Sequence, residues 1–547
     1  MEVRELEDLR IFHSFIRERF NHLIINKNMY MKIRTLLFTF LLTIPLLQAQ
    51  DRYLDEVFDS VIVVREMLYG INITVITGAP AADSLHVDVY MPAGDTLTER
   101  PVAIVLHSGT FLPPGFASTI GNRHDYVNVE TCKRLAKRGY VAVNMDYRVG
   151  WNPVSPEEIV RRATILQAVW RSMQDTYSCI RYLNKTVVDF ANPYGLDTDK
   201  IAIYGIGTGG FVGFNMMALD KWRTEIYIDK FRNPIDGTPF IDTLLFGDLE
   251  NTQAGAINIP LHVGYKDDFH FSFGLDGALG DSSWLDEDNV VVPFVIGGVV
   301  EHPTTPFGID PITDEINCDM PVFAGAGTNV FVVNIAGSAC MAQKANEIGM
   351  NAALEVKDWD DDVSNAIREH EYAQEHLWAI HLPGDDTLAQ TGPWEYWDAA
   401  FWSTVPHPDP RYDNFHEAGL ATNPDMSMEK ANRYIDTSLW LFAPRACLAM
   451  GLSTCLESSV ENLNEAEFDF TIAPNPTSGE VRISIEGNDQ LTKIVVFDML
   501  GKMVRSFDNV NDLSFVFDVS DLAPGMYGIR AEVGQKGYLS SKIIVQQ

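Results

Sequence analysis

Three apolar segments in the first half of the chain constrain its fold most strongly: Val102–Leu106, Tyr140–Asn144 and Lys200–Tyr204. Runs of consecutive apolar side chains are typical of strands buried on both faces of a sheet. Segments with helical periodicity, Val129–Arg138 and Pro156–Asn184, alternate with these strands. The alternation predicts an α/β fold with a mostly parallel sheet and helices on both faces.

The same pattern continues toward residue 452. We expect a helix at Phe211–Leu219 and strands at Ile259–Gly264, Val291–Ile296, Asn329–Ile335 and Leu377–Leu382. A last helix within Met426–Leu452 should end or be interrupted near Pro444, because proline lacks the N–H that a helix interior needs.

The composition changes after Cys455. Residues 457–467 are acidic and lack aromatic side chains, as is typical of a linker. From Phe468 onward, short β-like segments alternate with turn clusters, which predicts a small all-β sandwich. We therefore expect an α/β domain at 51–456, a linker at 457–467 and a β-sandwich at 468–547.

Residues 1–50 contain an export signal. Met31–Arg34 is basic, Thr35–Leu47 is apolar and small residues follow, so we expect a signal peptide cleaved near Ala49. The apolar run is too short to span a bilayer comfortably; the alternative is an uncleaved anchor. Residues 1–30 precede this signal and indicate a start codon assigned too early.

The net charge argues against two classes of partner. The 547 residues include 41 Lys and Arg against 75 Asp and Glu, a formal charge of −34. Nucleic-acid binding needs clustered basic side chains, and anionic membranes repel such a chain.

The cysteines indicate oxidation after export. An even number of cysteines in an exported chain favours disulfides. We expect the pairs Cys132–Cys179, Cys318–Cys340 and Cys447–Cys455, with six buried thiols as the alternative.

Gly205–Gly210, with the sequence GIGTGG, follows a predicted strand and opens a predicted helix. A dinucleotide-binding turn would need an acidic residue after a further strand, about 20 residues on, and no such strand is evident. A phosphate-binding loop would need Gly-Lys-Ser/Thr. We therefore expect no cofactor. The remaining pattern is the nucleophile elbow, G-x-S-x-G, with Gly207 at the nucleophile position.

From about Leu85 to Leu452 the chain resembles the secreted carboxylesterase/lipase-like branch of the α/β-hydrolase superfamily. The motifs that carry this resemblance are VLHSGTF at 105–111, CKRLAKRGY at 132–140, VNMDYR at 143–148, DTYSCIRYL at 175–183 and YGLDTDKI at 194–201. The first is similar to the family's His-Gly-Gly-Gly oxyanion loop, with Ser108 and Thr110 replacing glycines. The resemblance implies an α/β-hydrolase fold and an esterase-like site.

The resemblance also assigns the triad-equivalent positions. The nucleophile corresponds to Gly207, the acid to Glu301 and the base to Asp386 or Thr387, with His381 as a possible base nearby. Other candidate bases are His302, His407 and His416. Because Gly207 has no side chain, the triad is degenerate, and only about 10³–10⁴-fold acceleration over water would remain.

Five positions are candidates for an oxyanion or binding site: His107, Ser108, Gly109, Thr110 and Thr208. Backbone N–H groups of the last three could bind an anion without a nucleophile. We expect the Ser108 hydroxyl to bond loop backbone, and Thr208 is the alternative nucleophile.

Two further clusters are more simply structural. The acidic run Asp358, Asp360, Asp361 and Asp362 lacks the spacing of a calcium loop and predicts a solvated loop or helix start, so no metal site is expected. The aromatic group Trp394, Tyr396, Trp397, Phe401 and Trp402 predicts core or lid packing, with sugar stacking as the alternative.

The C-terminal domain has its own resemblance. Residues 472–479 (IAPNPTSG), 496–502 (VFDMLGK) and 522–527 (LAPGMY) look like the type A sorting domain of the type IX secretion route, and 536–543 fit its terminal strand. The resemblance implies contact with the secretion machinery and a secreted or surface-attached product. The alternative is a generic β-sandwich binding module with ordinary turn residues.

Three hypotheses for function follow. The first is an exported α/β-hydrolase-fold protein that binds a small-molecule or ester-like ligand, or a partner, without a working triad. The second is an active carboxylic-ester hydrolase with an unconventional nucleophile. The third is a surface carbohydrate-binding or adhesion protein.

Overall fold

The computed structural model describes residues 52–546 except 290, 303–304, 311, 326–329, 356–358, 360, 370–371, 373, 382–390, 453–460, 463–467, 469, 488, 498–502 and 535–536. The predicted signal peptide therefore lies outside the described residues, as does the predicted linker apart from Glu461–Asn462.

An eight-stranded sheet forms the centre of the α/β domain, with the strand order β1-β2-β4-β3-β5-β6-β7-β10. Its strands are β1 (Val61–Thr74), β2 (Ala81–Pro92), β3 (Arg100–Leu106), β4 (Val141–Met145), β5 (Leu196–Ile206), β6 (Phe271–Leu275), β7 (Phe294–Val299) and β10 (Leu377–Ile380). The β1–β2 and β2–β4 pairs are antiparallel, and all the others are parallel. The predicted α/β class and mostly parallel sheet are confirmed.

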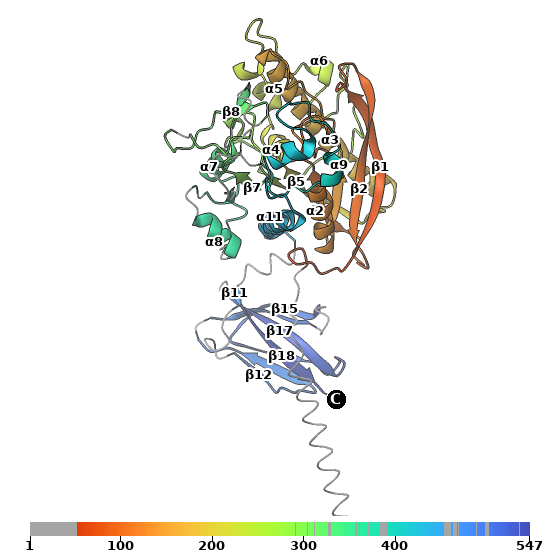
Figure 1. Ribbon diagram of the computed structural model, residues 1–547. Helices are drawn as coiled ribbons and strands as arrows, with labels where there is room; N and C mark the ends of the chain where they lie inside the picture. Colours follow the sequence, from red (N-terminus) through yellow and green to blue (C-terminus); the bar gives the residue numbers. More distant parts are fainter. Residues whose placement is uncertain are drawn as a thin grey trace, which may run out of the picture. The chain divides into compact units, whose positions relative to one another are not determined.

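Helices cover both faces of this sheet (Figure 1). On one face, α2 (Tyr126–Lys137) and α11 (Met428–Ala449) share a core with alternate side chains of β3, β4 and β5. On the other, α3 (Glu158–Asp189) and α4 (Thr208–Ala218) share a core with the opposite side chains of the same strands, and α7 (Ser338–Ile348) packs on β7 and β10. Burial on both faces explains the apolar runs Val102–Leu106 in β3 and Val141–Val143 in β4.

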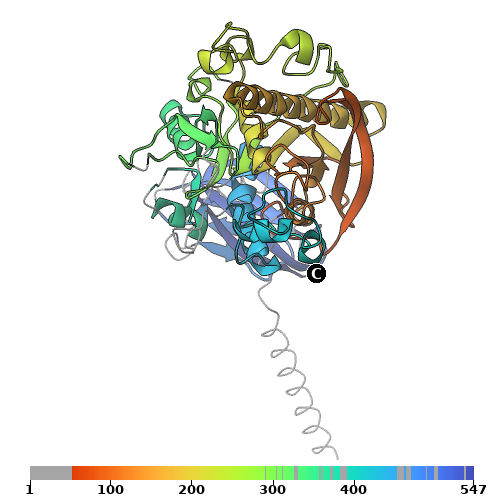
Figure 2. The ribbon, with the colours of Figure 1, turned by 45° about the horizontal axis from the view of Figure 1, so that its top comes forward.

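Short elements complete the domain. Figure 2 shows the long helix α3 with the segment that contains α5 and α6 beside it, and Trp170 of α3 packs edge-on against Trp222 of α5. The remaining elements are α5 (Trp222–Glu225), η1 (Asp229–Phe231), α6 (Thr243–Phe246), η2 (Ser282–Trp284), α8 (Asp362–Arg368), α9 (Ala399–Trp402), α10 (Phe415–Leu420) and the hairpin β8 (Met320–Phe323) with β9 (Phe331–Ile335).

Two sequence predictions were wrong here. The segment Ile259–Gly264 is not a strand, because Ile259 bonds both its N–H and its carbonyl to the Asn72 side chain on β1. The strand that pairs with β5 is instead β6, at Phe271–Leu275. The last helix also continues through Pro444 rather than ending there.

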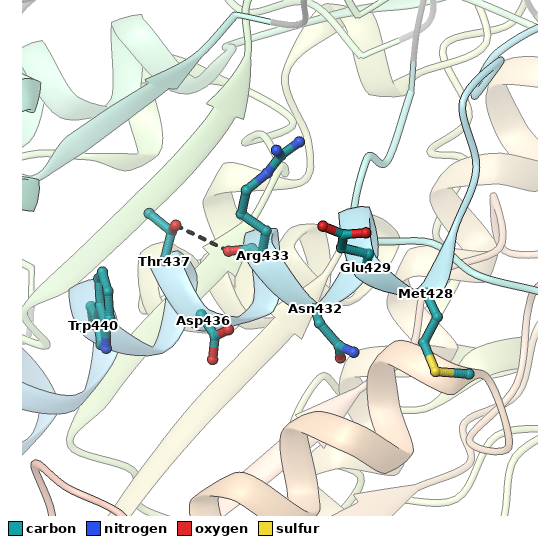
Figure 3. Close-up of a pocket in the computed structure, with 7 residues that line it drawn as sticks. All are labelled: Met428, Glu429, Asn432, Arg433, Asp436, Thr437 and Trp440. Atoms are coloured by element: carbon teal, nitrogen blue, oxygen red, sulfur yellow. Dashed lines mark hydrogen bonds between the residues drawn. The ribbon is translucent and has the colours of Figure 1, made fainter.

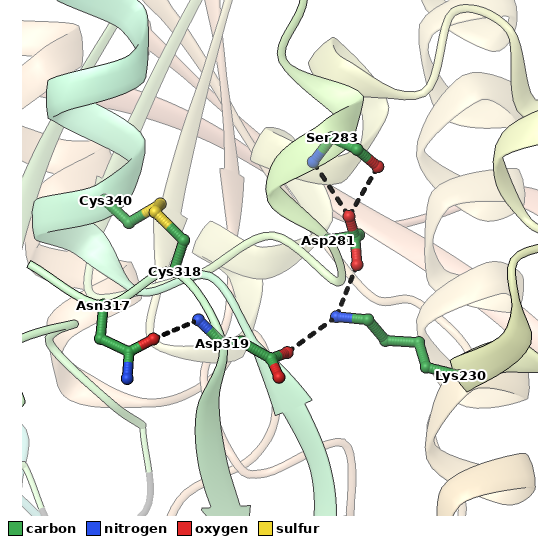
Figure 4. The surroundings of a disulfide bond; sticks show 7 residues. All are labelled: Lys230, Asp281, Ser283, Asn317, Cys318, Asp319 and Cys340. Atoms are coloured by element: carbon green, nitrogen blue, oxygen red, sulfur yellow. Dashed lines mark hydrogen bonds and ion pairs between the residues drawn. A yellow bond between two sulfur atoms is a disulfide. The ribbon is translucent and has the colours of Figure 1, made fainter.

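The cysteines give one correction. Cys318 and Cys340 form the predicted disulfide (Figure 4), and Cys447 is also disulfide-bonded, while its predicted partner Cys455 lies outside the described residues. The predicted Cys132–Cys179 pair is wrong. Both thiols are free and buried, and each belongs to the core on a different face of the sheet.

The C-terminal region forms two facing sheets with a shared apolar core. One has the order β11-β18-β17-β14-β15 and the other β12-β13-β16. Their strands are β11 (Glu461–Asn462), β12 (Thr471–Ala473), β13 (Glu480–Ser484), β14 (Leu491–Phe497), β15 (Met503–Asp512), β16 (Ser514–Asp518), β17 (Gly525–Val533) and β18 (Gly537–Val545). All pairs except β11–β18 are antiparallel, which agrees with the predicted sandwich.

Candidate functional site

The turn between β5 and α4 has the backbone of a nucleophile elbow. Gly207, its apex, has φ 53° and ψ −114°, and α4 begins at the next residue. The Gly207 N–H donates to Leu275 O of β6, which fixes the turn to the neighbouring strand. A side chain is strained in this conformation, so glycine holds the elbow shape without that cost.

Ser108 occupies the space that an elbow nucleophile would need. A Cβ atom built on Gly207 would lie 2.2 Å from Ser108 Oγ and 3.1 Å from Ser108 Cβ. The predicted bond from this hydroxyl to loop backbone is not formed, and Ser108 Oγ has no hydrogen bond to any residue that the structure describes. The loop after β3 has therefore closed over the empty nucleophile position.

The loop after β3 also keeps free N–H groups. In the described part of the chain, no acceptor bonds the backbone N–H of Gly109, Thr110 or Thr208. Thr110 and the next residue, Phe111, both have φ 55°, a conformation that is unusual for residues other than glycine. Unpaired N–H groups from a loop and a helix start are the components of an oxyanion hole.

Tyr147 holds this loop in place. Its ring stacks on the buried His107 at 4.1 Å between centroids, and its hydroxyl donates to His107 O at 2.5 Å. The same hydroxyl lies 3.3 Å from Thr208 Oγ1. Burial lowers the pKa of His107, whose Nδ1 bonds Ser108 O. His107 and Thr208 are thus engaged in holding the loop and the start of α4.

A cavity of about 480 Å³ lies over the elbow. Ser108, Gly207 and Thr208 line it, and most of its other walls are apolar, including Phe111, Met173 and Phe211. This volume and lining are typical of small-molecule sites.

Glu301 and His381 form a pair beside the sheet. Glu301 follows β7 and His381 directly follows β10, and His381 Nδ1 lies 2.5 Å from Glu301 Oε1. Both side chains are roughly half exposed, and neither lines the cavity over the elbow. Asp386 and Thr387 lie outside the described residues.

A second acid–histidine pair does line the cavity. His302 Nε2 lies 3.6 Å from Asp276 Oδ2, and His302 Nδ1 accepts the Thr305 N–H. Burial lowers the pKa of His302 to about 4 and raises the pKa of Asp276 to about 7. Since Nδ1 accepts an N–H, the neutral ring carries its proton on Nε2, facing Asp276. Sequence reasoning considered His302 but missed Asp276, because it missed β6, the strand that Asp276 follows.

Glu395 is a further cavity residue that the sequence did not reveal. Its neighbours Trp394 and Trp397, from the predicted aromatic group, also line the cavity, whereas Tyr396, Phe401 and Trp402 do not. Of the other candidate bases, His407 lies at the cavity and His416 accepts the Trp397 indole N–H.

The predicted acidic run includes a helix start. Asp361 caps α8 by accepting the Ser364 N–H, while Asp358 and Asp360 lie outside the described residues. Within the described ranges, no three His, Cys, Asp or Glu side chains are placed to hold a metal ion.

A second hollow, of about 620 Å³, lies along α11 between Met428 and Trp440 (Figure 3). Trp440 is exposed there, and Thr437 Oγ1 donates to Arg433 O of the preceding turn. No residue of the elbow or oxyanion loop lines this hollow, so we place the candidate site at the elbow.

With the site described, comparison with known proteins defines its class. A family model described as BD-FAE matches residues 87–233, which include β3, the oxyanion loop and the elbow. Together with the strand order and the elbow, this match defines an esterase-like α/β-hydrolase domain.

A second family model, described as a secretion system C-terminal sorting domain, matches residues 471–546. The protein therefore has an esterase-like α/β-hydrolase domain and a type IX sorting domain, and it is secreted or attached to the cell surface. None of the helices in the described part of the chain has the length and apolar character that crossing a membrane requires.

No curated protein matches this chain. Among solved structures, a phosphonate-inhibited esterase B from Lactobacillus rhamnosis is 15% identical, covering 45% of this chain and 68% of that one, with a TM-score of 0.27. Native esterase 2 from Thermogutta terrifontis is 17% identical, covering 46% and 74%, with a TM-score of 0.25. Brefeldin A esterase, a bacterial homologue of human hormone sensitive lipase, is 15% identical, covering 54% and 67%, with a TM-score of 0.26.

Proposed function

We propose that this exported protein binds a small, largely apolar, carbonyl-bearing molecule in the cavity over its elbow and does not hydrolyse it. The observation that carries the proposal is the position of Ser108 Oγ, 2.2 Å from where the Cβ of an elbow nucleophile would lie. A site that only lacked its serine would leave this space open.

The rest of the site supports binding. The unpaired N–H groups of Gly109, Thr110 and Thr208 can donate to a carbonyl oxygen, as oxyanion-hole donors do. The apolar walls can bury an acyl chain, and about 25 cal/mol of favourable free energy accompanies each Å² of apolar surface buried. Neither function requires a nucleophile.

The test uses the exported chain and p-nitrophenyl hexanoate. We expect saturable binding, measured by quenching of tryptophan fluorescence, without release of p-nitrophenolate above the rate measured in the absence of protein. Catalytic turnover would contradict the proposal, and so would the absence of binding by any apolar ester.

A second candidate function is ester hydrolysis with Ser108 as nucleophile, which the placement of its hydroxyl over the elbow favours. General-base activation requires a histidine within hydrogen-bonding reach, and Ser108 has no such partner among the described residues. Turnover that Ser108→Ala abolishes, together with covalent labelling of Ser108 by a fluorophosphonate, would establish this function instead.

We also propose the domain limits 51–456 and 468–547, with a signal peptide removed near Ala49. Mass spectrometry of the exported protein would test the cleavage site, and limited proteolysis would test the linker at 457–467.

A further inference from the structure

The cavity over the elbow contains acidic groups without a compensating cation. Asp276, Glu395 and Asp409 line it, while Arg411 is the one Arg or Lys among the described lining residues. The exposed Arg411 pairs with Asp409, with its Nε 2.8 Å from Asp409 Oδ2. Asp276 and Glu395 are therefore left without a positively charged side chain.

Backbone hydrogen bonds and packing of the neighbouring residues place Glu395 at the cavity. Its N–H donates to Gly392 O, and its carbonyl accepts the side chain of Asn423, which follows α10. Trp397, two residues later, is packed against Gly419 of α10. The Glu395 carboxyl itself has no hydrogen bond or ion pair with any described residue, although it lies where a charged group loses most of its solvation.

Asp276 is almost completely buried. Its Oδ1 accepts the Val299 N–H, and its Oδ2 faces His302 at 3.6 Å, beyond hydrogen-bond distance. Burying a carboxylate without a positively charged partner costs free energy. Two such groups in one cavity create a site whose natural complement is positive charge.

The other walls favour an organic cation over a metal ion. Aromatic residues line the cavity: Trp151, Phe211, Trp284, Trp394, Trp397, Tyr412 and Phe415. Aromatic faces attract ammonium groups and pack against aliphatic chains. A metal ion would need three or more ligating side chains, and the described residues contain no group of three His, Cys, Asp or Glu placed to hold one.

We propose that the cavity binds an organic ammonium ion with an apolar tail, its positive charge matched by Glu395 and Asp276. This inference rests on the proposed function, ligand binding at the elbow, and specifies the ligand class. A primary ammonium offers three donors, enough for both carboxylates.

The proposal predicts a pH dependence with a definite sign. Burial, with the nearby Asp125 and Asp276, raises the pKa of Glu395 to about 8. An ammonium ligand binds the ionised carboxylate of Glu395. As pH rises from about 6 to about 8, fewer Glu395 side chains have to lose a proton before they bind it, so the affinity for the ammonium should rise. The affinity of a neutral ligand should not rise.

The other charged groups at the cavity do not reverse this sign. Burial raises the pKa of Asp276 to about 7, which acts in the same direction. His302, with its pKa near 4, stays neutral over this range. His407, Asp409 and Arg411 also line the cavity. Arg411 pairs with Asp409.

The experiment compares three probes with one tail: octylammonium, octan-1-ol and octanoate, titrated into the exported chain by calorimetry at about pH 8. We expect octylammonium to bind at least about 10-fold more tightly than octan-1-ol, as a charge-assisted hydrogen bond allows, and octanoate to bind most weakly. The advantage of octylammonium should shrink at about pH 6.

Two variants and one control locate the effect. Glu395→Gln should remove the advantage of octylammonium and leave octan-1-ol unchanged. Gly392→Ala keeps the carboxyl but places a methyl group 2.5 Å from Glu395 Oε1, and it should weaken octylammonium binding selectively. Glu429→Gln, on the exposed face of α11, should change neither affinity.

Each other outcome has a distinct meaning. Equal affinity for octylammonium and octan-1-ol, or tightest binding of octanoate, would overturn the cation proposal while ligand binding stands. Equal weakening of both ligands by Glu395→Gln would also overturn it. If none of the three probes binds while p-nitrophenyl hexanoate does, the cation proposal fails and ligand binding stands. If p-nitrophenyl hexanoate does not bind either, the proposed function itself fails.

Discussion

Introducing a serine at the elbow apex should be costly unless Ser108 is removed with it. The Gly207→Ser change places a side chain on a residue with φ 53° and ψ −114°, which costs about 1–3 kcal/mol of backbone strain. Its Cβ would also lie 2.2 Å from Ser108 Oγ, and relieving such overpacking costs about 1–3 kcal/mol more. We therefore expect Gly207→Ser to destabilise the α/β domain by about 2–6 kcal/mol in sum.

The double variant separates the two contributions. Ser108→Gly removes the clash, so Gly207→Ser in that background should retain only the backbone strain. The loss of unfolding free energy in the double variant should then be about 1–3 kcal/mol smaller than the sum of the losses in the two single variants. The control Ser118→Gly changes a serine of the same loop region whose hydroxyl bonds Ile120 O, and it should show no coupling with Gly207→Ser.

Thermal unfolding of the four proteins of the cycle measures this coupling. For a domain of this size, each kcal/mol shifts the midpoint by roughly 1–2 °C, so Gly207→Ser alone should unfold several degrees below the double variant. Additive shifts, within about 0.5 kcal/mol, would mean that Ser108 does not fill the nucleophile space, and the reasoning would be refuted.

Three further predictions concern stability. Burial raises the pKa values of three carboxyls, those of Asp276 and Asp125 to about 7 and that of Glu395 to about 8. Unfolding lowers these pKa values, whereas buried histidines such as His302, with its pKa near 4, act in the opposite direction only below about pH 6.5. Stability should therefore fall as pH rises from about 6.5 to about 8, and Glu395→Gln should flatten the measured melting profile. Replacing Cys318 and Cys340 by serine opens a 22-residue separation and should cost about 3 kcal/mol, seen as a lower melting temperature. Asp175→Asn leaves the fully buried Arg148 unpaired and should cost about 3–5 kcal/mol in denaturant titration.

Each of these predictions has an outcome that would contradict it. A melting temperature that rises from about pH 6.5 to about pH 8 would contradict the sign of the carboxyl effect. The cysteine variant is compared with Cys132→Ser, which removes a free thiol and leaves the Cys318–Cys340 bond intact. Asp199→Asn removes an exposed ion pair with Lys266 and should hardly change the free energy of unfolding. If Asp175→Asn and Asp199→Asn lower this free energy equally, burial of the ion pair does not determine the cost.

The sequence predicted the sheet best where a strand is buried on both faces. The apolar runs in β3, β4 and β5 have no other simple interpretation, so these strands and the turn after β5 could be located from the sequence. It failed at β6, because FSFGL has only five residues and its Ser and Gly interrupt the apolar pattern expected of a buried strand. Ile259 and Val263 resemble a strand in sequence, but they are partly exposed, and Asn72 holds the Ile259 backbone outside the sheet.

The site was predictable at the elbow and less so around it. The glycine pattern located Gly207 because backbone geometry there allows few residue types. Ser108 was found, but its role was not, since nothing local to a loop indicates which distant turn its hydroxyl will meet. Glu395 lies nearly 190 residues beyond the elbow, and only the packing of its segment against α10 brings it to the cavity.

The Cys318–Cys340 bond lies behind one wall of the cavity. Cys318 precedes β8, whose Val322 and Phe323 line the cavity, and Cys340 belongs to α7. Beside the bond, Lys230 contacts both Asp281 and Asp319 (Figure 4). Thiols stay reduced in the cytoplasm and oxidise only in exported compartments. Because the protein is exported, the bond between the segment before β8 and α7 forms only after the chain has left the cytoplasm.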